Sequence, residues 1–167
     1  MKTSFNIVLV GGGSTWTPGL LKALCKLKTR LPLKKLVMFD VNEERQAVIG
    51  EYAKVLFREE YPDLEFIYTG DENVAFTDMD FIFCQMRTGG YAMREKDEKI
   101  PLSLGVIGQE TCGAGGFAYG MRSIRDMIAL VEKVRARSPR AWILNYTNPA
   151  AIVADALNKI GRASCRE

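Results

Sequence analysis

Hydrophobic residues along the chain gather in short runs that alternate with longer amphipathic stretches. Short apolar runs are typical of strands that a parallel sheet buries on both faces, and helical spacing of apolar residues indicates amphipathic helices. The runs predict strands over residues 6–10, 35–40, 64–69, 80–86 and 141–144. The spacing predicts helices over residues 18–28, 43–60, 124–137 and 150–160, a helical or mixed segment over 91–104, and a short helix or turn over 72–76. This alternation predicts an α/β fold class, a Rossmann-like, doubly wound parallel sheet with helices on both faces.

Two segments carry more detailed expectations. The helix predicted over residues 43–60 has apolar residues on one side, which we expect to face the core. These residues are Val48, Tyr52, Val55 and Leu56. Residues 105–117 are rich in glycine, which favours a loop.

The end of the chain does not continue the repeating pattern. Gly161–Glu167 (GRASCRE) shows no apolar periodicity, and no further strand follows the helix predicted from Ala150. Doubly wound sheets usually have about six strands, whereas the pattern predicts five. We therefore expect an incomplete chain whose anomalous tail comes from a truncation, a frameshift or an added sequence.

Composition narrows the possible classes of protein. The chain has 167 residues, of which 47% are hydrophobic and 26% charged, as in ordinary soluble domains. No apolar run approaches the roughly 18 residues of a membrane span, and the net charge of +3 is dispersed. We therefore predict a cytoplasmic protein with no membrane and no nucleic-acid partner.

The chain contains no histidine, which excludes several kinds of site. A Ser-His-Asp or Cys-His site, and a metal bound by histidines of this chain alone, are all impossible. The four cysteines form no CxxC pair, and we expect them to be reduced. Any chemistry must use other groups or a cofactor.

The strongest signal for a ligand lies at the end of the first predicted strand. Gly11-Gly12-Gly13 allows a tight turn that a pyrophosphate can approach, and the helix that follows presents its N-terminal N–H groups. Ser14 and Thr15 add hydroxyl donors. Asp40, at the end of the second strand, can accept hydrogen bonds from both ribose hydroxyls of NAD and would repel the extra phosphate of NADP. We therefore predict that Gly11, Gly13, Ser14, Thr15 and Asp40 bind NAD.

The match to the dinucleotide-binding motif is partial, so alternatives stay open. The third glycine of GxGxxG would fall at Trp16, and Asp40 lies further along than the roughly 20 residues that are usual. The glycines could form a plain structural turn, or the domain could bind another phosphate. Trp16 packs either beside a ligand or in the core.

Three polar residues follow the carboxyl ends of later strands, where open α/β sheets bind ligands. Arg94 could clamp an anionic group, or pair with Glu95 or Glu98 as an exposed helix charge. Asn148, before Pro149, could reach a substrate hydroxyl or cap the next helix. Glu110 could tune a base or face solvent.

Three segments together resemble glycoside hydrolase family 4. They are GGGSTWTPGL, IGQETCGAGGFAYGMRSI and NYTNPAAIV, and the likeness extends over residues 6–160. Within this family, the segments Thr-Cys-Gly and AYGMRSI are similar to those of the 6-phospho-α-glucosidase branch. The resemblance implies an NAD-binding domain over residues 1–160, with only the N-terminal portion of the enzyme present.

The resemblance also implies an unusual glycosidase chemistry. NAD oxidises C3 of the sugar, Mn²⁺ polarises the C3 oxygen, and the aglycone leaves by elimination. The substrate would be a phosphorylated disaccharide such as maltose 6'-phosphate. By motif, Arg94 and Asn148 resemble substrate-binding residues, and Glu110 resembles the acid that raises the basicity of the catalytic tyrosine.

Several residues that the family uses are missing from this sequence. The Cys-Asp pair, the histidine ligand and the base tyrosine are expected beyond its end, and Cys165 lacks a following Asp. We therefore predict no metal site and no glycosidase activity for this chain alone, and a homo-oligomer for the full-length relative. Two other hypotheses remain: a fragment of a lactate- or malate-type NAD-dependent dehydrogenase, and a non-catalytic NAD-binding module.

Overall fold

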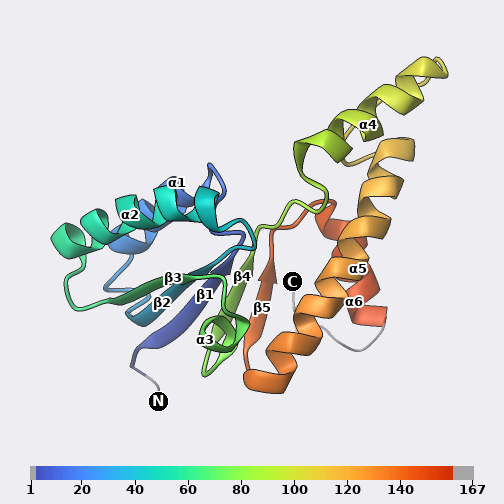
Figure 1. The fold of residues 1–167 in the computed structure, drawn as a ribbon. Helices are drawn as coiled ribbons and strands as arrows, with labels where there is room; N and C mark the ends of the chain where they lie inside the picture. Colours follow the sequence, from blue (N-terminus) through green and yellow to red (C-terminus); the bar gives the residue numbers. More distant parts are fainter. Residues whose placement is uncertain (1–2, 160–167) are drawn as a thin grey trace. The chain divides into compact units, whose positions relative to one another are not determined.

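A computed structural model describes residues 3–159 and shows alternating strands and helices (Figure 1). The strands are β1 (Phe5–Val10), β2 (Leu33–Phe39), β3 (Glu65–Thr69), β4 (Phe81–Cys84) and β5 (Trp142–Asn145). The helices are α1 (Thr17–Lys26), α2 (Glu43–Glu60), α3 (Glu72–Phe76), α4 (Gly90–Ser103), α5 (Gly113–Arg137) and α6 (Ala150–Lys159). Each predicted strand and helix is present. Ile160 and the tail Gly161–Glu167 lie outside the described residues.

The five strands form one sheet in the order β3-β2-β1-β4-β5. β1 pairs in parallel with β2 and β4, and β2 pairs in parallel with β3. β5 is tied to the start of β4 by the Trp142 N–H, which donates to the Asp80 carbonyl at 2.8 Å. This order, with the chain returning to the sheet centre between β3 and β4, is that of a Rossmann-like domain, so the predicted fold class is confirmed.

Alternate residues of the central strands bury one face of the sheet under α1 and α2, which lie side by side in Figure 1. A proline in the first turn of α1 suits its free N-terminus. Asn42 caps α2 by accepting a hydrogen bond from the Arg45 N–H at 2.9 Å. The core between sheet and helices contains Ile7, Leu9, Leu36 and Met38 from the strands, and Leu21, Leu24, Ala53 and Phe57 from the helices.

The opposite alternation of β1 and β2 buries Val8, Val10, Val37 and Phe39. The ring of Phe39 packs on Phe76 of α3, with 4.9 Å between the ring centroids. Ser138, just after α5, donates to the Phe76 carbonyl at 2.7 Å. The same hydroxyl accepts from the Met79 N–H at 2.8 Å, so a buried serine fixes α3 and the end of α5.

The chain forms two compact units. The first contains residues 1–85 and 133–144, and therefore the glycine turn, β1 to β4, α1 to α3 and most of β5. The second contains residues 86–132 and those from 145 onward, and therefore α4, most of α5 and α6. The predicted NAD contacts belong to the first unit, and Arg94, Glu110 and Asn148 belong to the second.

The predicted apolar face of α2 is wrong for three of its four residues, since only Leu56 is half-buried and packs against the core. Val48 is 72% exposed, and Tyr52 and Val55 are also exposed. The buried face instead contains Gln46, Gly50, Ala53 and Phe57. Gly50 lies so close to the ring of Tyr68 in β3 that a Cβ there would overlap it. The small residues of α2 therefore face the sheet. They let the helix lie closer to β3 than the larger valine side chains would allow.

The predicted loop over residues 105–117 is wrong in its last part, because α5 already begins at Gly113. Gly115 and Gly116 belong to the first turn of the helix, where they face neighbouring backbone. A Cβ on Gly115 would lie 2.5 Å from the carbonyl oxygens of Asp97 and Gln109. These glycines permit close packing against α4 and the preceding loop, rather than a break in the helix.

A pair of glycine substitutions tests how α2 packs. We expect Gly50→Ala to destabilise the chain by about 1–3 kcal/mol, since the added methyl group overlaps Tyr68. Gly19→Ala in α1 is the matched control, because nothing lies within 4 Å of a Cβ there. Alanine should stabilise that helix by up to about 1 kcal/mol. Urea unfolding followed by circular dichroism measures both changes, and an equal effect of the two substitutions would contradict the packing described for Gly50.

Candidate functional site

The glycine turn follows β1 directly and is held by the end of β2. Gly11 has a positive φ of 88°, a conformation that favours glycine. The N–H groups of Gly11 and Gly12 both donate to the Phe39 carbonyl, at 2.9 and 3.1 Å. The Gly13 N–H donates to Asp40 Oδ2 at 2.9 Å. The structure therefore places Asp40 beside the glycine turn, which brings together the residues that the sequence assigned to one ligand.

Side chains on the second and third glycines would not fit. A Cβ on Gly12 would lie 2.8 Å from Gln46 Oε1, and a Cβ on Gly13 would lie 3.1 Å from Asp40 Oδ2. Gln46 is itself buried, and it donates through Nε2 to the Thr69 carbonyl at 3.0 Å. The turn is thus pressed against the N-terminal part of α2.

The N–H groups of all three glycines already donate within the chain, so they are not the free donors that a pyrophosphate would need. Among residues 3–159, the Thr15 N–H has no acceptor, and Thr15 itself is exposed. The N–H groups and hydroxyls at the start of α1 therefore offer the donors, with Ser14 and Thr15 as predicted.

Asp40 is fixed from two sides. Oδ2 accepts from Gly13, and Oδ1 accepts from the Asn42 N–H at 2.9 Å. A carboxylate oxygen can accept more than one hydrogen bond, so both oxygens keep capacity for a ligand hydroxyl. Trp16 is 81% exposed, which excludes the alternative that it packs in the core.

A residue that the sequence interpretation missed also contacts the turn. Gln85 is the first residue after β4, and its Nε2 donates to the Gly11 carbonyl at 3.2 Å and to Thr17 Oγ1 at 2.7 Å. Thr17 is fully buried. A glutamine directly after an apolar strand was the available signal, since a polar side chain there is directed to the ligand edge of a parallel sheet.

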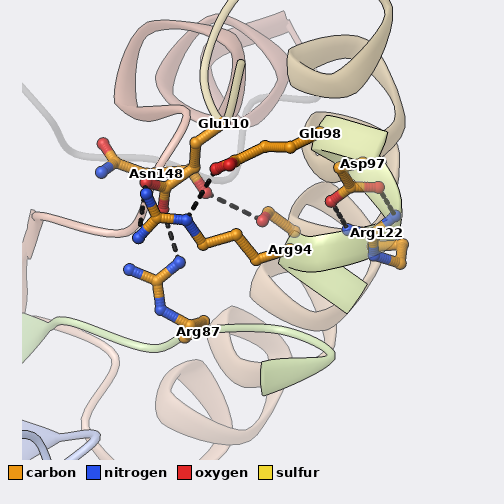
Figure 2. A network of polar contacts seen from close by, with 8 residues as sticks. Arg87, Arg94, Asp97, Glu98, Glu110, Arg122 and Asn148 are labelled. Atoms are coloured by element: carbon orange, nitrogen blue, oxygen red, sulfur yellow. Dashed lines mark hydrogen bonds and ion pairs between the residues drawn. The ribbon is translucent and has the colours of Figure 1, made fainter. Parts of the chain in front are cut away.

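In the second unit, two arginines converge on Glu110 (Figure 2). Arg87 Nη1 lies 2.5 Å from Glu110 Oε1, and Arg94 Nη1 lies 3.3 Å from Oε2. The Glu110 side chain is 17% exposed, so the alternative that it faces solvent is wrong. Each oxygen of one carboxylate thus pairs with a different arginine, which fixes the orientation of both guanidinium groups.

Arg94 does more than the simple helix pairing that the sequence left open. Its Nε donates to Glu98 at 2.8 Å, one of the pairings considered, while Glu95 pairs with Lys99. The hydrogen bond to Glu98 and the charge of Glu110 raise the pKa of Arg94 above its usual value. Arg94 therefore stays fully charged, and the contact with Glu110 links α4 to the loop before α5.

A second ion pair, which sequence reasoning missed, joins α4 to α5. Arg122 donates to both oxygens of Asp97, through Nη1 at 3.0 Å and through Nη2. The Asp97 side chain is only 6% exposed. The Arg122 guanidinium also lies over the ring of Tyr119, 5.7 Å from its centroid.

Tyr119 lies near these charges and is buried. Burial raises the pKa of the Tyr119 phenol, while the positive charge of Arg87 lowers it and the negative charge of Glu110 raises it. The phenol is therefore neutral at ordinary pH. The AYGMRSI segment therefore contributes the polar groups of Tyr119 and Arg122 to the second unit, in addition to packing contacts of α5.

Asn148 lies in the turn after β5, and the Asn148–Pro149 peptide bond is cis. The fully buried Ser123 hydroxyl donates to the Asn148 carbonyl at 2.9 Å. The Asn148 side chain is exposed and makes no hydrogen bond within residues 3–159, so it does not cap α6 there. It thus remains open to a ligand.

Other sites are absent from the described part of the chain. Residues 3–159 contain no group of three or more His, Cys, Asp or Glu side chains that could hold a metal ion. No disulfide joins the cysteines in this range. None of the helices described is long and apolar enough to span a bilayer.

Comparison with known proteins identifies the family. The model of the family 4 glycosyl hydrolases matches residues 6–164 of the chain. The chain belongs to glycosyl hydrolase family 4. Phospho-α-glucosidase PagL of Clostridium acetobutylicum is 55% identical over 157 residues, which cover 93% of this chain and 35% of that protein. Maltose-6'-phosphate glucosidase of Bacillus subtilis is 50% identical over 95% of this chain and 35% of its own length.

Solved structures of family 4 agree with this assignment. A 6-phospho-α-glucosidase from gut microorganisms, solved with NAD and Mn²⁺, has a TM-score of 0.92 and 58% identity, over 94% of this chain and 36% of that one. This family 4 chain thus spans about a third of the length of the relatives that it matches. A lactate dehydrogenase of Trichomonas vaginalis gives a TM-score of 0.63 at 13% identity over 98% of this chain and 44% of that one, which shows a shared fold alone.

The buried ion pair provides a test of how this family 4 chain builds its second unit. We expect Asp97→Ala to destabilise that unit by about 2–4 kcal/mol, since it leaves the charge of Arg122 without its partner. Glu95→Ala is the control. It breaks an exposed pair with Lys99 on the same helix and should cost less than about 1 kcal/mol. Thermal unfolding measures both variants, and similar losses would show that the Asp97–Arg122 pair is not a structural tie.

Proposed function

We propose that the chain is the NAD-binding part of a family 4 glycosidase that acts on 6-phospho-α-glucosides such as maltose 6'-phosphate. The observation that carries this proposal is the contact between the Asp40 carboxylate and the glycine turn. It supports a dinucleotide because a carboxylate and an open helix N-terminus then adjoin one turn. Relatives of the same family have been solved with NAD.

The residues of the first unit fit NAD. The glycine turn carries no side chains, and Cβ atoms on Gly12 and Gly13 would meet Gln46 and Asp40, so glycine there lets the turn lie against α2 and the end of β2. Asp40 would accept hydrogen bonds from the ribose hydroxyls, and its charge would disfavour the 2'-phosphate of NADP. Ser14 and Thr15 would donate to the pyrophosphate, and exposed Trp16 would flank the ligand.

NAD, when bound, supplies the hydride acceptor for oxidation at C3 of the sugar. The residues of the second unit would bind and orient that sugar. Arg94 would donate to its hydroxyl or phosphate oxygens, and the unbonded amide of Asn148 would contact a hydroxyl. Glu110 would fix the orientation of the two arginines.

Manganese does not fit the described residues, and we derive no step through it. The chain has no histidine, and residues 3–159 contain no cluster of potential ligands. The metal that accompanies NAD in a related structure would need ligands outside these residues.

The α-branch is favoured over the β-branch by identity. Relatives named phospho-α-glucosidase or maltose-6'-phosphate glucosidase are 49–55% identical to the chain. A 6-phospho-β-glucosidase of Escherichia coli is 36% identical over 94% of this chain and 35% of its own length. The dehydrogenase alternative has lost its support, because the family match assigns the chain to the glycosidases. Cytoplasmic location and a homo-oligomeric whole protein stay predictions.

Substitution of Asp40 tests the cofactor. We expect the wild-type chain to bind NAD more tightly than NADP in calorimetric titrations. Asp40→Asn, which keeps an acceptor oxygen beside Gly13, should weaken NAD binding by about tenfold through loss of a charge-assisted hydrogen bond. In the same variant, the difference between the affinities for NAD and for NADP should be smaller than in the wild type. Asp63→Asn, an exposed aspartate outside the turn, is the control. A folded wild-type chain with no affinity for NAD would overturn the proposal.

An activity assay tests whether this chain alone has glycosidase activity. We expect this chain, with NAD and Mn²⁺ added, to release no 4-nitrophenol from 4-nitrophenyl 6-phospho-α-glucoside, because it lacks a histidine ligand. A complete 6-phospho-α-glucosidase of the family serves as the positive control. Turnover by the chain alone, proportional to its concentration, would show that residues 1–167 contain the whole catalytic apparatus.

A further inference from the structure

Besides Asp40, the side chain of the residue that follows β4 also holds the glycine turn. Gln85 follows β4, and its own N–H donates to the Val10 carbonyl at 3.0 Å, beside the start of the turn. Its side-chain Nε2 then reaches the Gly11 carbonyl and Thr17 Oγ1. One side chain thereby joins the first glycine of the turn to the first residue of α1.

The Gly11 carbonyl is the critical group in this arrangement. A carbonyl oxygen carries a partial negative charge, so it would repel a pyrophosphate if it faced the ligand. Here the oxygen accepts from Gln85 Nε2 at 3.2 Å and from the Ser14 N–H at 3.1 Å. Both donors belong to the chain, and together they hold this oxygen within the turn.

The amide side chain satisfies both neighbours at once. Nε2 carries two hydrogens, and the two acceptors, a carbonyl and a hydroxyl, use both of them. A glutamate of the same shape would present an oxygen to the Gly11 carbonyl and would add a negative charge. A methionine would fill the space without donating.

We propose that Gln85 is a positioning residue for the dinucleotide, which turns the Gly11 carbonyl inward and sets the start of α1 to receive the pyrophosphate. This inference rests on the proposed NAD site. It assigns to Gln85 no contact with the reacting atoms. Its effect on binding acts through Gly11 and Thr17, both of which belong to the same compact unit as Gln85.

Calorimetric titration of the full chain with NAD, at pH 8 and at pH 5.5, tests this role. Gln85→Glu should bind NAD at least tenfold more weakly at pH 8, because it loses both donated bonds and repels the phosphates. At pH 5.5 a growing fraction of the new carboxyl group is protonated and can donate again, so affinity should recover severalfold. Gln85→Met should be weakened at both pH values without recovery.

Wild type and Gln109→Glu are the controls, since Gln109 is exposed and lies in the other unit. Both should show the same weak pH dependence. Circular dichroism checks that each variant is folded before titration. Folded Gln85 variants that bind NAD as wild type does would overturn the positioning role and leave the NAD site intact. Unfolding of both Gln85 variants would assign the residue to stability instead. A folded wild type without NAD affinity would overturn the NAD site and this inference together.

Discussion

The structure depends on a close approach of backbone between the ends of β1 and β2. The Phe39 carbonyl accepts two consecutive N–H groups of the glycine turn, and the next N–H is taken by Asp40. This approach is possible because the turn has no side chains. It places a carboxylate beside a helix N-terminus, two groups that the sheet order then exposes at its ligand edge. The cofactor site is thus a consequence of how the two strands end.

The second unit relies on ion pairs as well as on close backbone contacts. The two oxygens of Glu110 pair with Arg87 and Arg94, and the two oxygens of Asp97 accept from Nη1 and Nη2 of Arg122. Such pairs fix the direction of long, flexible side chains, at the cost of removing charges from water. The benefit is that the guanidinium group is already oriented, so it loses less conformational entropy when it binds a phosphorylated sugar. This explains why paired arginines occur at a site proposed to bind a phosphorylated substrate.

The sequence predicted the fold well, because strand and helix periods, caps and turn residues are local signals. It also predicted that Asp40 adjoins the glycine turn, since both follow the carboxyl ends of neighbouring strands. The sequence-based predictions failed where tertiary contacts determine which residues are buried or where a helix begins. The buried face of α2 follows the fit of Gly50 to Tyr68, and the start of α5 depends on glycines packed against other backbone. The Gln85 and Arg122 contacts span 68 and 25 residues, and no local pattern encodes such pairings.

The glycines show why the same residue gave both correct and incorrect predictions. At Gly11 a positive φ requires glycine, and the turn signal in the sequence has its ordinary meaning. At Gly50 and Gly115 the requirement is space for a neighbouring ring or carbonyl, and the backbone is helical. Gly50 and Gly115 therefore mark places where another group approaches the backbone, whereas nothing lies within 4 Å of a Cβ on Gly19. At Gly12 and Gly13 the approaching groups already include Gln46 and Asp40 on the inner side. The proposed dinucleotide would therefore contact the segment of Ser14, Thr15 and Trp16, where, among residues 3–159, the Thr15 N–H has no acceptor and the Trp16 ring is exposed.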